Sequence, residues 1–288
     1  MLCAYNAQHT NGSMARILQM PRHAIHSRAI GRLMDNVLFI KGKISRITIN
    51  RPERHNSLDA KTLGELTACV GKASADKSCR SIIITGAGGK AFSAGADIGY
   101  ISGISSKAAA EKFFGMFYAM RNSILKSPKL VVAAINGYCL GGGNELAMAC
   151  DIRIASEDAT FGQPEVKLGI VPGGGATYAL GQITGVSMAR ELILTGRSFD
   201  AKEALRIGLV SRVLKKEALD SEAIRICKEA DSCGPDAIAL AKDAINKAYE
   251  IDCKNEEEAF VKAVMGKEGR EGIKAFLQHR KAYFADEA

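Results

Sequence analysis

Tryptophan is absent from this 288-residue sequence, and histidine occurs only five times. Three histidines fall within the first 34 residues, so only His55 and His279 remain for the rest of the chain. Chemistry that depends on a histidine-activated serine or cysteine therefore has few candidates. The eight cysteines form no Cys-x-x-Cys pair and have no histidine at a zinc-binding spacing. We interpret them as reduced thiols and expect no metal site.

Long apolar runs are also missing. Stretches such as residues 131–135 are far shorter than the ~18 residues that a membrane-spanning helix needs. Hydrophobic residues make up 47% of the chain and charged residues 24%, which is typical of a globular protein and argues against disorder. The length suits one large domain, with or without a small appendage. The net charge of +8 fits an anionic ligand, a nucleic acid or a basic compartment, and selects none of them.

Acidic residues are missing from the start of the chain. No aspartate or glutamate precedes Asp35, whereas Arg16, Arg22, Arg28 and Arg32 do. A basic, acid-free start is typical of a mitochondrial transit peptide, so we treat residues 1–34 as a basic N-terminal extension and expect a mitochondrial matrix protein. Two alternatives stay open. Residues 16–24 resemble a nonapeptide import signal of the peroxisome or glycosome, and the segment also fits a tail that precedes a later start methionine.

The body of the chain alternates between strand and helix patterns. Apolar residues fill 37–40 and are interleaved with polar ones over 44–49, on either side of Lys41-Gly42-Lys43, which predicts two antiparallel strands joined by a tight turn. Residues 59–75 have helical apolar spacing, with Asp59 as the expected N-cap. Further strands are predicted at 81–85, 131–135 and 152–155, and further helices at 106–126 and 143–150. This alternation predicts an α/β core.

Strand signals become weak from residue 187 onward. Helices are predicted at 187–194, 201–208, 221–230, 236–250 and 256–264. Gly234-Pro235 is the clearest break, and Pro235 is expected near the start of the helix that follows it. The last quarter of the chain is therefore predicted to be helical.

A glycine-rich segment at residues 86–91 satisfies the G-x-G-x-x-G/A pattern of dinucleotide-binding proteins. The next residues, 92–97, are mostly small and predict a loop where that motif requires a helix, and no acid ends a second strand about 20 residues later. A P-loop is excluded as well, because Ala91 follows Lys90 where Ser or Thr is needed. We therefore reject both nucleotide-binding motifs.

A second glycine cluster is more informative. Gly141, Gly142 and Gly143 precede or begin the helix predicted at 143–150. Glycine lets the backbone approach a ligand because it has no Cβ. The N-terminus of a helix offers free N–H groups that favour an anion, or a carbonyl that acquires negative charge. Glu145 lies in the first turn as a candidate acid–base residue, with an ordinary role in complementing the helix dipole as the alternative.

A third segment places Glu165 among apolar and glycine neighbours. Such surroundings raise the pKa of a carboxyl group toward the range in which it exchanges protons near neutrality. A solvated loop acid is the alternative interpretation. Taken together, two carboxylates and a glycine-rich N–H donor predict proton transfer beside a polarised carbonyl.

Several ordered motifs carry a resemblance to a known family. They are Ala94-Gly95-Ala96-Asp97-Ile98, residues 136–151, Gly162-Gln163-Pro164-Glu165 and Pro172-Gly173-Gly174-Gly175. With these motifs the sequence resembles the crotonase superfamily, and most of all enoyl-CoA hydratase, from about residue 37 to residue 284. This resemblance implies an α/β fold built as a spiral of ββα units. It also implies a core at residues 35–200 and a helical C-terminal region at 201–288 that forms trimers, commonly paired into a hexamer.

The resemblance also implies a reaction and a substrate. The substrate would be an acyl-CoA thioester whose oxygen is held by the backbone N–H groups of Ala96 and Gly142. Glu145 would help to activate water, and Glu165 would supply a proton to Cα of a trans-2-enoyl-CoA. Asp97, Ile98, Gly141 and Gly143 are the further residues expected to bind substrate. We expect a lyase of fatty-acid β-oxidation that needs no metal and no cofactor, with coenzyme A as part of its substrate.

Alternatives within and beyond the superfamily remain. An enoyl-CoA isomerase commonly keeps the second acid and lacks the first, so the presence of both favours hydration. An acyl-CoA hydrolase is the other alternative within the superfamily. An RNA-binding hydratase-like protein is the minor one, because one superfamily member binds RNA through lysines of an early helix. Here Lys61, Lys72 and Lys77 form a sparse set interrupted by acids, and we expect no nucleic-acid partner.

Overall fold

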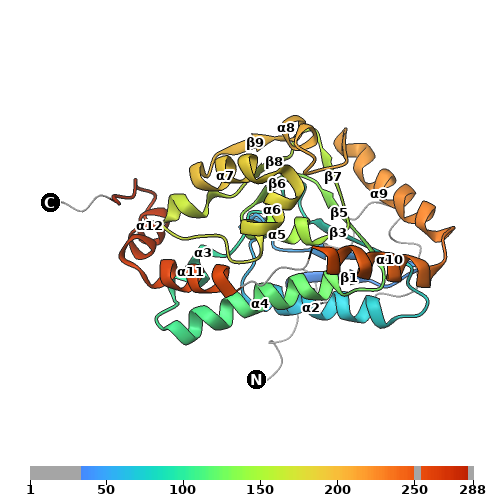
Figure 1. Cartoon of the computed structure of the whole chain (residues 1–288), viewed down its shortest axis with the longest axis horizontal. Helices are drawn as coiled ribbons and strands as arrows, with labels where there is room; N and C mark the ends of the chain where they lie inside the picture. Colours follow the sequence, from blue (N-terminus) through green and yellow to red (C-terminus); the bar gives the residue numbers. More distant parts are fainter. Residues whose placement is uncertain (1–33, 250–253, 285–288) are drawn as a thin grey trace, which may run out of the picture.

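The computed structural model describes residues 34–249 and 254–284, and the chain folds there into two sheets flanked by helices (Figure 1). The larger sheet contains β1 (Val37–Ile40), β2 (Ile44–Ile49), β3 (Ser81–Gly86), β5 (Leu130–Ile135), β7 (Ile152–Ser156) and β10 (Arg212–Leu214), in that order. The smaller sheet contains β4 (Ala91–Ser93), β6 (Tyr138–Leu140), β8 (Thr160–Gly162) and β9 (Ser198–Asp200). The predicted α/β core is confirmed, whereas the expected extension at 1–34 lies outside the described residues except for its last one.

The two sheets are built from repeated strand pairs. After the antiparallel hairpin β1–β2, all neighbours in the larger sheet are parallel. Strands β3, β5 and β7 each continue directly into a strand of the smaller sheet, namely β4, β6 and β8. A helical segment follows each pair; after the first two pairs it returns the chain to the next parallel strand, and after the third it leads to β9, which pairs antiparallel with β8. This arrangement is the expected series of ββα units, and it brings the ends of β4, β6 and β8 together.

Helices cover both faces of the larger sheet. Alternate residues of a strand point to opposite faces, so Ile82 and Ile84 of β3 pack into the main core while Ile83 packs with α9 (Lys216–Asp231). The main core includes buried residues of α2 (Ala60–Ala75) and α4 (Lys107–Leu125). Figure 1 shows these two helices along one side of the molecule.

The two long helices α2 and α4 both begin at a side chain that caps the first turn. The Asp59 carboxylate accepts from the N–H of Thr62 at 2.8 Å, and Ser106 Oγ accepts from the N–H of Ala109 at 3.2 Å. Each bond satisfies one of the free N–H groups of a first helical turn. The N-cap role predicted for Asp59 is confirmed.

The glycine-rich segment at 86–91 is a turn that joins β3 to β4. Gly88 and Gly89 have φ values of +79° and +69°, which only glycine adopts readily. A strand follows this segment instead of a helix, so rejecting the dinucleotide-binding motif was correct.

The C-terminal part is mainly helical, as predicted, and contains two short strands that the pattern missed. Its helices are α6 (Ala176–Thr184), α7 (Val186–Thr195), α8 (Ala201–Arg206), α9, α10 (Pro235–Ala248), α11 (Lys254–Met265) and α12 (Lys267–Leu277). Strands β9 and β10 have three residues each, too few for a readable alternation. Since β10 pairs with β7, the larger sheet extends beyond residue 200. The division proposed at that residue stays a prediction.

No helix within residues 34–249 and 254–284 is long and apolar enough to cross a membrane. Within the same residues, no three His, Cys, Asp or Glu side chains gather closely enough to hold a metal ion.

Candidate active site

The N–H group of Ala96 is exposed to a potential ligand by the way its loop pairs with Leu58. Leu58 donates to the Gly95 carbonyl at 2.8 Å, and the N–H of Asp97 donates to the Leu58 carbonyl at 3.0 Å. Successive N–H groups of an extended backbone point in opposite directions, so the Ala96 N–H faces away from Leu58. It donates to no acceptor within the described residues.

The N–H of Gly142 lies beside that of Ala96. Gly142 begins α5 (Gly142–Ala149), whose first-turn N–H groups have no partner inside the helix. A Cβ added to Gly142 would lie 3.3 Å from the Ala96 nitrogen, and one added to Gly95 would lie 3.1 Å from the Gly142 nitrogen. Only glycine permits so close an approach of two backbone segments. The two N–H groups named from the sequence therefore form one donor site at a helix N-terminus.

Glu145 projects from the first turn of α5 into a closed environment. Its side chain is 4% exposed, and its Oε1 accepts from the N–H groups of Gly174 at 2.8 Å and Ala176 at 3.0 Å. Burial and the nearby carboxylates of Glu165 and Glu256 raise the pKa of Glu145 well above its ordinary value, and the two N–H donors oppose that rise. Two backbone donors thus fix the orientation of the Glu145 carboxyl group and favour its ionised form, against the effect of burial.

Glu165 lies on a short 3-10 helix, η3 (Pro164–Leu168), against the same glycine turn. A Cβ added to Gly141 would lie 2.7 Å from Glu165 Oε1, and Gly141 has a φ of +50°. Oε1 accepts one long bond of 3.4 Å from Gln163, and the buried Oε2 has no hydrogen-bond partner in the described residues. Burial, reinforced by the charge of Glu256, raises the pKa of Glu165 to about 7. This carboxyl group can exchange a proton near neutrality.

A buried amide pair orients the side chain that contacts Glu165. Asn144 Nδ2 donates to Gln163 Oε1 at 2.9 Å, and neither residue is more than 1% exposed. Because its oxygen is occupied, the Gln163 amide turns its NH2 group toward Glu165. The sequence analysis missed this pair, although Gln163 stands two residues before Glu165 in a motif that was singled out.

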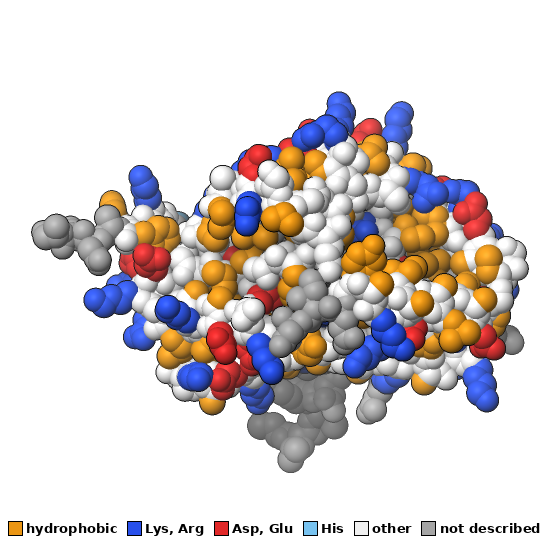
Figure 2. Space-filling view, viewed as in Figure 1, with side chains coloured by type: hydrophobic (Ala, Val, Ile, Leu, Met, Phe, Trp, Pro, Cys, Tyr) orange, Lys and Arg blue, Asp and Glu red, His pale blue; other side chains and the backbone are white. Residues whose placement is uncertain are grey.

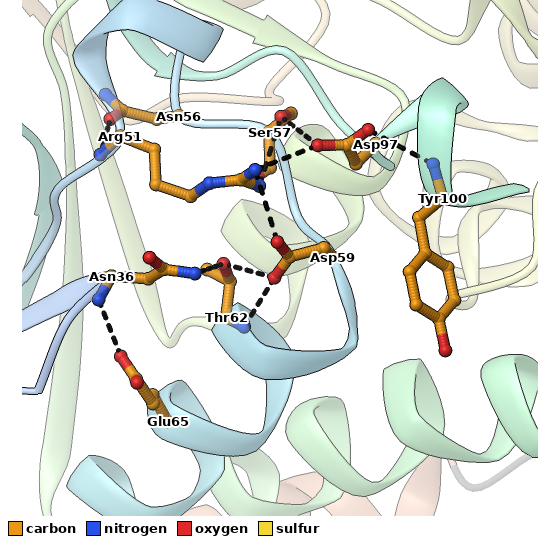
Figure 3. A network of polar contacts seen from close by, with 9 residues as sticks. All are labelled: Asn36, Arg51, Asn56, Ser57, Asp59, Thr62, Glu65, Asp97 and Tyr100. Carbon is orange, nitrogen blue, oxygen red and sulfur yellow. Dashed lines mark hydrogen bonds and ion pairs between the residues drawn. The ribbon is translucent and has the colours of Figure 1, made fainter.

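Asp97 is held by contacts within the chain (Figure 3). Its Oδ2 lies 3.0 Å from the Arg51 guanidinium, and its Oδ1 accepts from the Tyr100 N–H at 3.2 Å, which caps α3 (Ile98–Ser102). The same guanidinium donates to the Ser57 carbonyl at 2.7 Å and lies 3.2 Å from Asp59. Burial opposes ionisation of Asp97, yet Arg51 and the hydrogen bonds lower its pKa. The observed contacts of Asp97 hold the loop that carries Ala96.

The other predicted substrate-binding residues lie around the donor site. Ile98 is half-buried at the start of α3 and packs against the main core. Gly141 lies against Glu165, and a Cβ added to Gly143 would lie 2.3 Å from the Ser93 carbonyl oxygen. The missing side chains of these glycines therefore allow close packing within the chain. Direct contact with a substrate stays a prediction for all three.

Aromatic side chains of α4 form an apolar wall beside the donor site. A Cβ added to Gly142 would lie 2.6 Å from the Phe117 ring. Phe117 contacts Phe113 edge to face at 5.4 Å, and Phe113 packs on Tyr100 at 4.9 Å. This wall excludes water and strengthens electrostatic interactions at the site. Its helical spacing is visible in the sequence, but nothing in that pattern indicates which site the rings face.

The chain was compared with known families and structures. The model of the family described as enoyl-CoA hydratase/isomerase matches residues 40–287. A Clostridium acetobutylicum protein named short-chain-enoyl-CoA hydratase is 41% identical over 86% of this chain and 97% of its own length. A Syntrophomonas wolfei protein named crotonyl-CoA hydratase is 40% identical over 87% of this chain and 98% of its own. A crystal structure of an enoyl-CoA hydratase from Bacillus anthracis is 36% identical, with a TM-score of 0.72 over 87% of this chain and 99% of that one.

Proposed function

The chain belongs to the enoyl-CoA hydratase/isomerase family, and on that premise we propose that it adds water across the double bond of a short-chain trans-2-enoyl-CoA to give a 3-hydroxyacyl-CoA. One observation carries this proposal: the buried Glu145 and the half-buried Glu165, whose Oε2 is enclosed, lie beside the glycine turn at 141–143, where the N–H groups of Ala96 and Gly142 have no partner in the described residues. The relatives named short-chain-enoyl-CoA and crotonyl-CoA hydratase support a short acyl chain.

The N–H groups of Ala96 and Gly142 would receive the thioester oxygen. When the nucleophile bonds to Cβ, electron density moves through the conjugated system onto that oxygen, and the intermediate is an enolate. Two fixed N–H donors at a helix N-terminus stabilise this charge more than they stabilise the neutral thioester. Removal of one such donor typically slows a reaction on the order of 10²–10³-fold.

The two glutamates would divide the proton transfers. Burial and mutual repulsion favour one shared proton on the pair near neutrality. Two N–H bonds stabilise an ionised Glu145, whereas the Oε2 of Glu165 has no partner, so we place the proton on Glu165. Glu145 then takes a proton from water as the water oxygen bonds to Cβ, and Glu165 gives its proton to Cα. The pair again holds one proton, and its transfer from Glu145 to Glu165 restores the starting state.

The proposed chemistry uses only groups of this chain and the substrate. Coenzyme A enters as part of that substrate, and no metal or further cofactor takes part in any step above. Assignment to fatty-acid β-oxidation follows from the substrate class and belongs to the same proposal.

Hydration of crotonyl-CoA tests the proposal directly. The purified full chain should cause a rapid loss of the ultraviolet absorbance of the conjugated thioester. Glu145→Gln and Glu165→Gln should each slow that loss on the order of 10²–10⁴-fold, because each removes one acid–base group. Glu157→Gln is the matched control, since Glu157 is exposed and should retain the parent rate.

The result that would overturn the proposal is equally specific. A folded parent that leaves crotonyl-CoA and longer trans-2-enoyl-CoA substrates unchanged is not a hydratase. If Glu145→Gln stays active on a 3-enoyl-CoA while hydration is absent, the isomerase alternative replaces it. Release of free coenzyme A would favour the hydrolase alternative.

A homotrimer or homohexamer is part of the same proposal. Val186 and Leu194 of α7 and Leu240 and Ile245 of α10 are each at least 60% exposed. Figure 2 shows apolar side chains gathered over these helices on the face in view. Large exposed apolar areas commonly mark protein interfaces, and sedimentation equilibrium gives the subunit number.

Mitochondrial location, with the peroxisome or glycosome as the alternative, is testable by imaging the tagged full chain and an N-terminally truncated one.

A further inference from the structure

Glu256 is a third buried carboxyl group at the site, and it comes from the C-terminal helix α11. Its side chain is 5% exposed. Oε1 accepts from the Thr177 N–H at 3.0 Å and from the Thr177 hydroxyl, while the buried Oε2 has no partner in the described part of the chain. Neither the glycine motifs nor the proposed proton transfers account for a buried acid at this position.

Glu256 and Glu145 hold the same short segment. Glu145 accepts from Gly174 and Ala176, and Glu256 accepts from the next residue, Thr177. Thus three N–H groups at the start of α6 are bound by two carboxylates from different helices. A displacement of residues 174–177 would therefore change the orientation of the Glu145 carboxylate directly.

The helix that carries Glu256 also fixes the other end of that segment. A Cβ added to Gly173 would lie 2.6 Å from the ring of Phe260, one helical turn after Glu256. Phe260 packs on Phe114 of α4 at 5.9 Å between ring centres. Helix α11 therefore contacts residues 173–177 at both ends and connects them to α4.

In the described part of the chain, the charges of Arg121, Glu145 and Glu165 interact with Glu256. Arg121 of α4 lies over the Tyr178 ring at 4.9 Å, and a Cβ added to Gly175 would lie 3.0 Å from its Nε. The positive charge of Arg121 lowers the pKa of Glu256, whereas burial raises it and dominates. The negative charge of Glu256 in turn contributes to the raised pKa values of Glu145 and Glu165.

We propose that Glu256 is a positioning residue for the hydration step: it holds residues 173–177 so that Glu145 keeps its orientation. Its negative charge has a second, supporting effect, because it favours the protonated form of the Glu145–Glu165 pair. The inference rests on the proposed hydratase function and deepens it. Glu256 itself touches no reacting atom in this scheme. It acts through Thr177 on the backbone segment, and through space on the two catalytic carboxyl groups.

Two substitutions separate the geometric effect from the charge effect. Glu256→Gln keeps an oxygen that can accept from Thr177 but removes the charge. Two charges ~10 Å apart at an effective dielectric constant of ~20 change each other's pKa by ~1 unit. Glu256→Gln should therefore move the alkaline limb of the kcat profile to lower pH by ~0.5–1 unit, with kcat at pH 6 kept within about threefold.

Glu256→Ala should have a larger effect because it also releases Thr177. We expect kcat to fall ~10–100-fold at every pH, with KM changed less than about threefold, since small misplacement of a catalytic group affects the transition state more than substrate binding. Glu258→Gln is the matched control: it removes the same charge from the same helix at an exposed position. It should leave both kcat and the pH profile unchanged.

The experiment measures crotonyl-CoA hydration by parent and variants between pH 5.5 and 9. A parent without activity overturns the proposed function, and this inference with it. An active parent with a Glu256→Gln profile that coincides with that of Glu258→Gln overturns the charge role alone. If Glu256→Ala lowers thermal stability while the folded protein keeps the parent kcat and KM, the positioning role is overturned and Glu256 is only structural. Should the alanine variant fail to fold, the pH profile of Glu256→Gln decides: a profile that coincides with that of Glu258→Gln leaves Glu256 without a role in the reaction.

Discussion

Replacing Glu165 with glutamine should stabilise the folded protein at alkaline pH while it removes activity. Glu165 is buried beside other carboxyl groups, and burial raises its pKa from the ordinary value of 4.5 to about 7. Between these two values the folded state binds more protons than the unfolded state, so the free energy of unfolding falls as pH rises. Glutamine carries no charge at any pH and avoids that loss.

The magnitude follows from the pKa change. Each pH unit between 4.5 and about 7 costs about 1.4 kcal/mol, so ionising Glu165 in the folded state costs about 3 kcal/mol by pH 8. Below pH 4.5 the cost vanishes, because the group is protonated in both states. For a chain of this size we therefore expect Glu165→Gln to raise the melting temperature by ~5–10 °C at pH 8 and by almost nothing near pH 4.5.

Far-ultraviolet circular dichroism suits the measurement, because the chain has no tryptophan for fluorescence. Parent, Glu165→Gln and the exposed control Glu157→Gln should be melted at one protein concentration from pH 4.5 to pH 8, since self-association would add its own stabilisation. The reasoning fails if Glu165→Gln is no more stable than the parent at pH 8. It also fails if the gain is equally large at pH 4.5, because that gain would come from packing and not from ionisation.

Three other substitutions test the geometry of the site. In Gly141→Ala, the alanine would have a strained φ of +50° and its Cβ would lie 2.7 Å from Glu165 Oε1. We therefore expect thermal melts to show a free energy of unfolding lower by ~1–2 kcal/mol, and crotonyl-CoA hydration to show a kcat at least tenfold lower. Gln163→Leu leaves the buried Asn144 amide without its acceptor and should cost ~1–3 kcal/mol by the same melts. Asp97→Ala removes the N-cap of α3 and the acidic partner of the Arg51 guanidinium. It should lower the free energy of unfolding by ~1–2 kcal/mol and kcat/KM about tenfold. An unchanged kcat/KM would contradict the role of Asp97 in holding the Ala96 loop.

Elements with long, regular patterns could be predicted from the sequence. The strands at 37–40 and 44–49 have the predicted bounds because two short stretches rich in Val, Ile and Phe flank a Lys-Gly-Lys turn, which is a local signal. The N-cap of α2 was also correct, since Asp59 followed by helical apolar spacing is a local signal. Strands β9 and β10 were missed because each is defined by its pairing partner and not by its own three residues.

Residue patterns alone indicated the part of the candidate site that is contiguous in sequence, whereas the pairing of Ala96 with Gly142 came from the family resemblance. Glycines 141–143 and Glu145 belong to one turn, and their local pattern already indicated a donor site beside an acid. Glu256 was missed because its role depends on α11 packing against residues about 80 positions earlier. One signal was available: Glu256 lies four residues before Phe260, so both occupy one face of a helix whose other glutamates are more exposed.

The unpaired Oε2 of Glu165 connects stability to the proposed catalysis. A carboxyl group with all its lone pairs bound by N–H donors would have a low pKa and would hold no proton to transfer at neutral pH. Here Gln163 donates one long bond to Oε1 and the backbone N–H of Glu165 itself opposes the rise in pKa, whereas the buried Oε2 has no partner in the described residues and burial dominates. Folding therefore retains an energetically unfavourable buried acid, and that same state makes a proton available for Cα of the substrate. The predicted stability gain of Glu165→Gln and its predicted loss of activity thus have one physical cause.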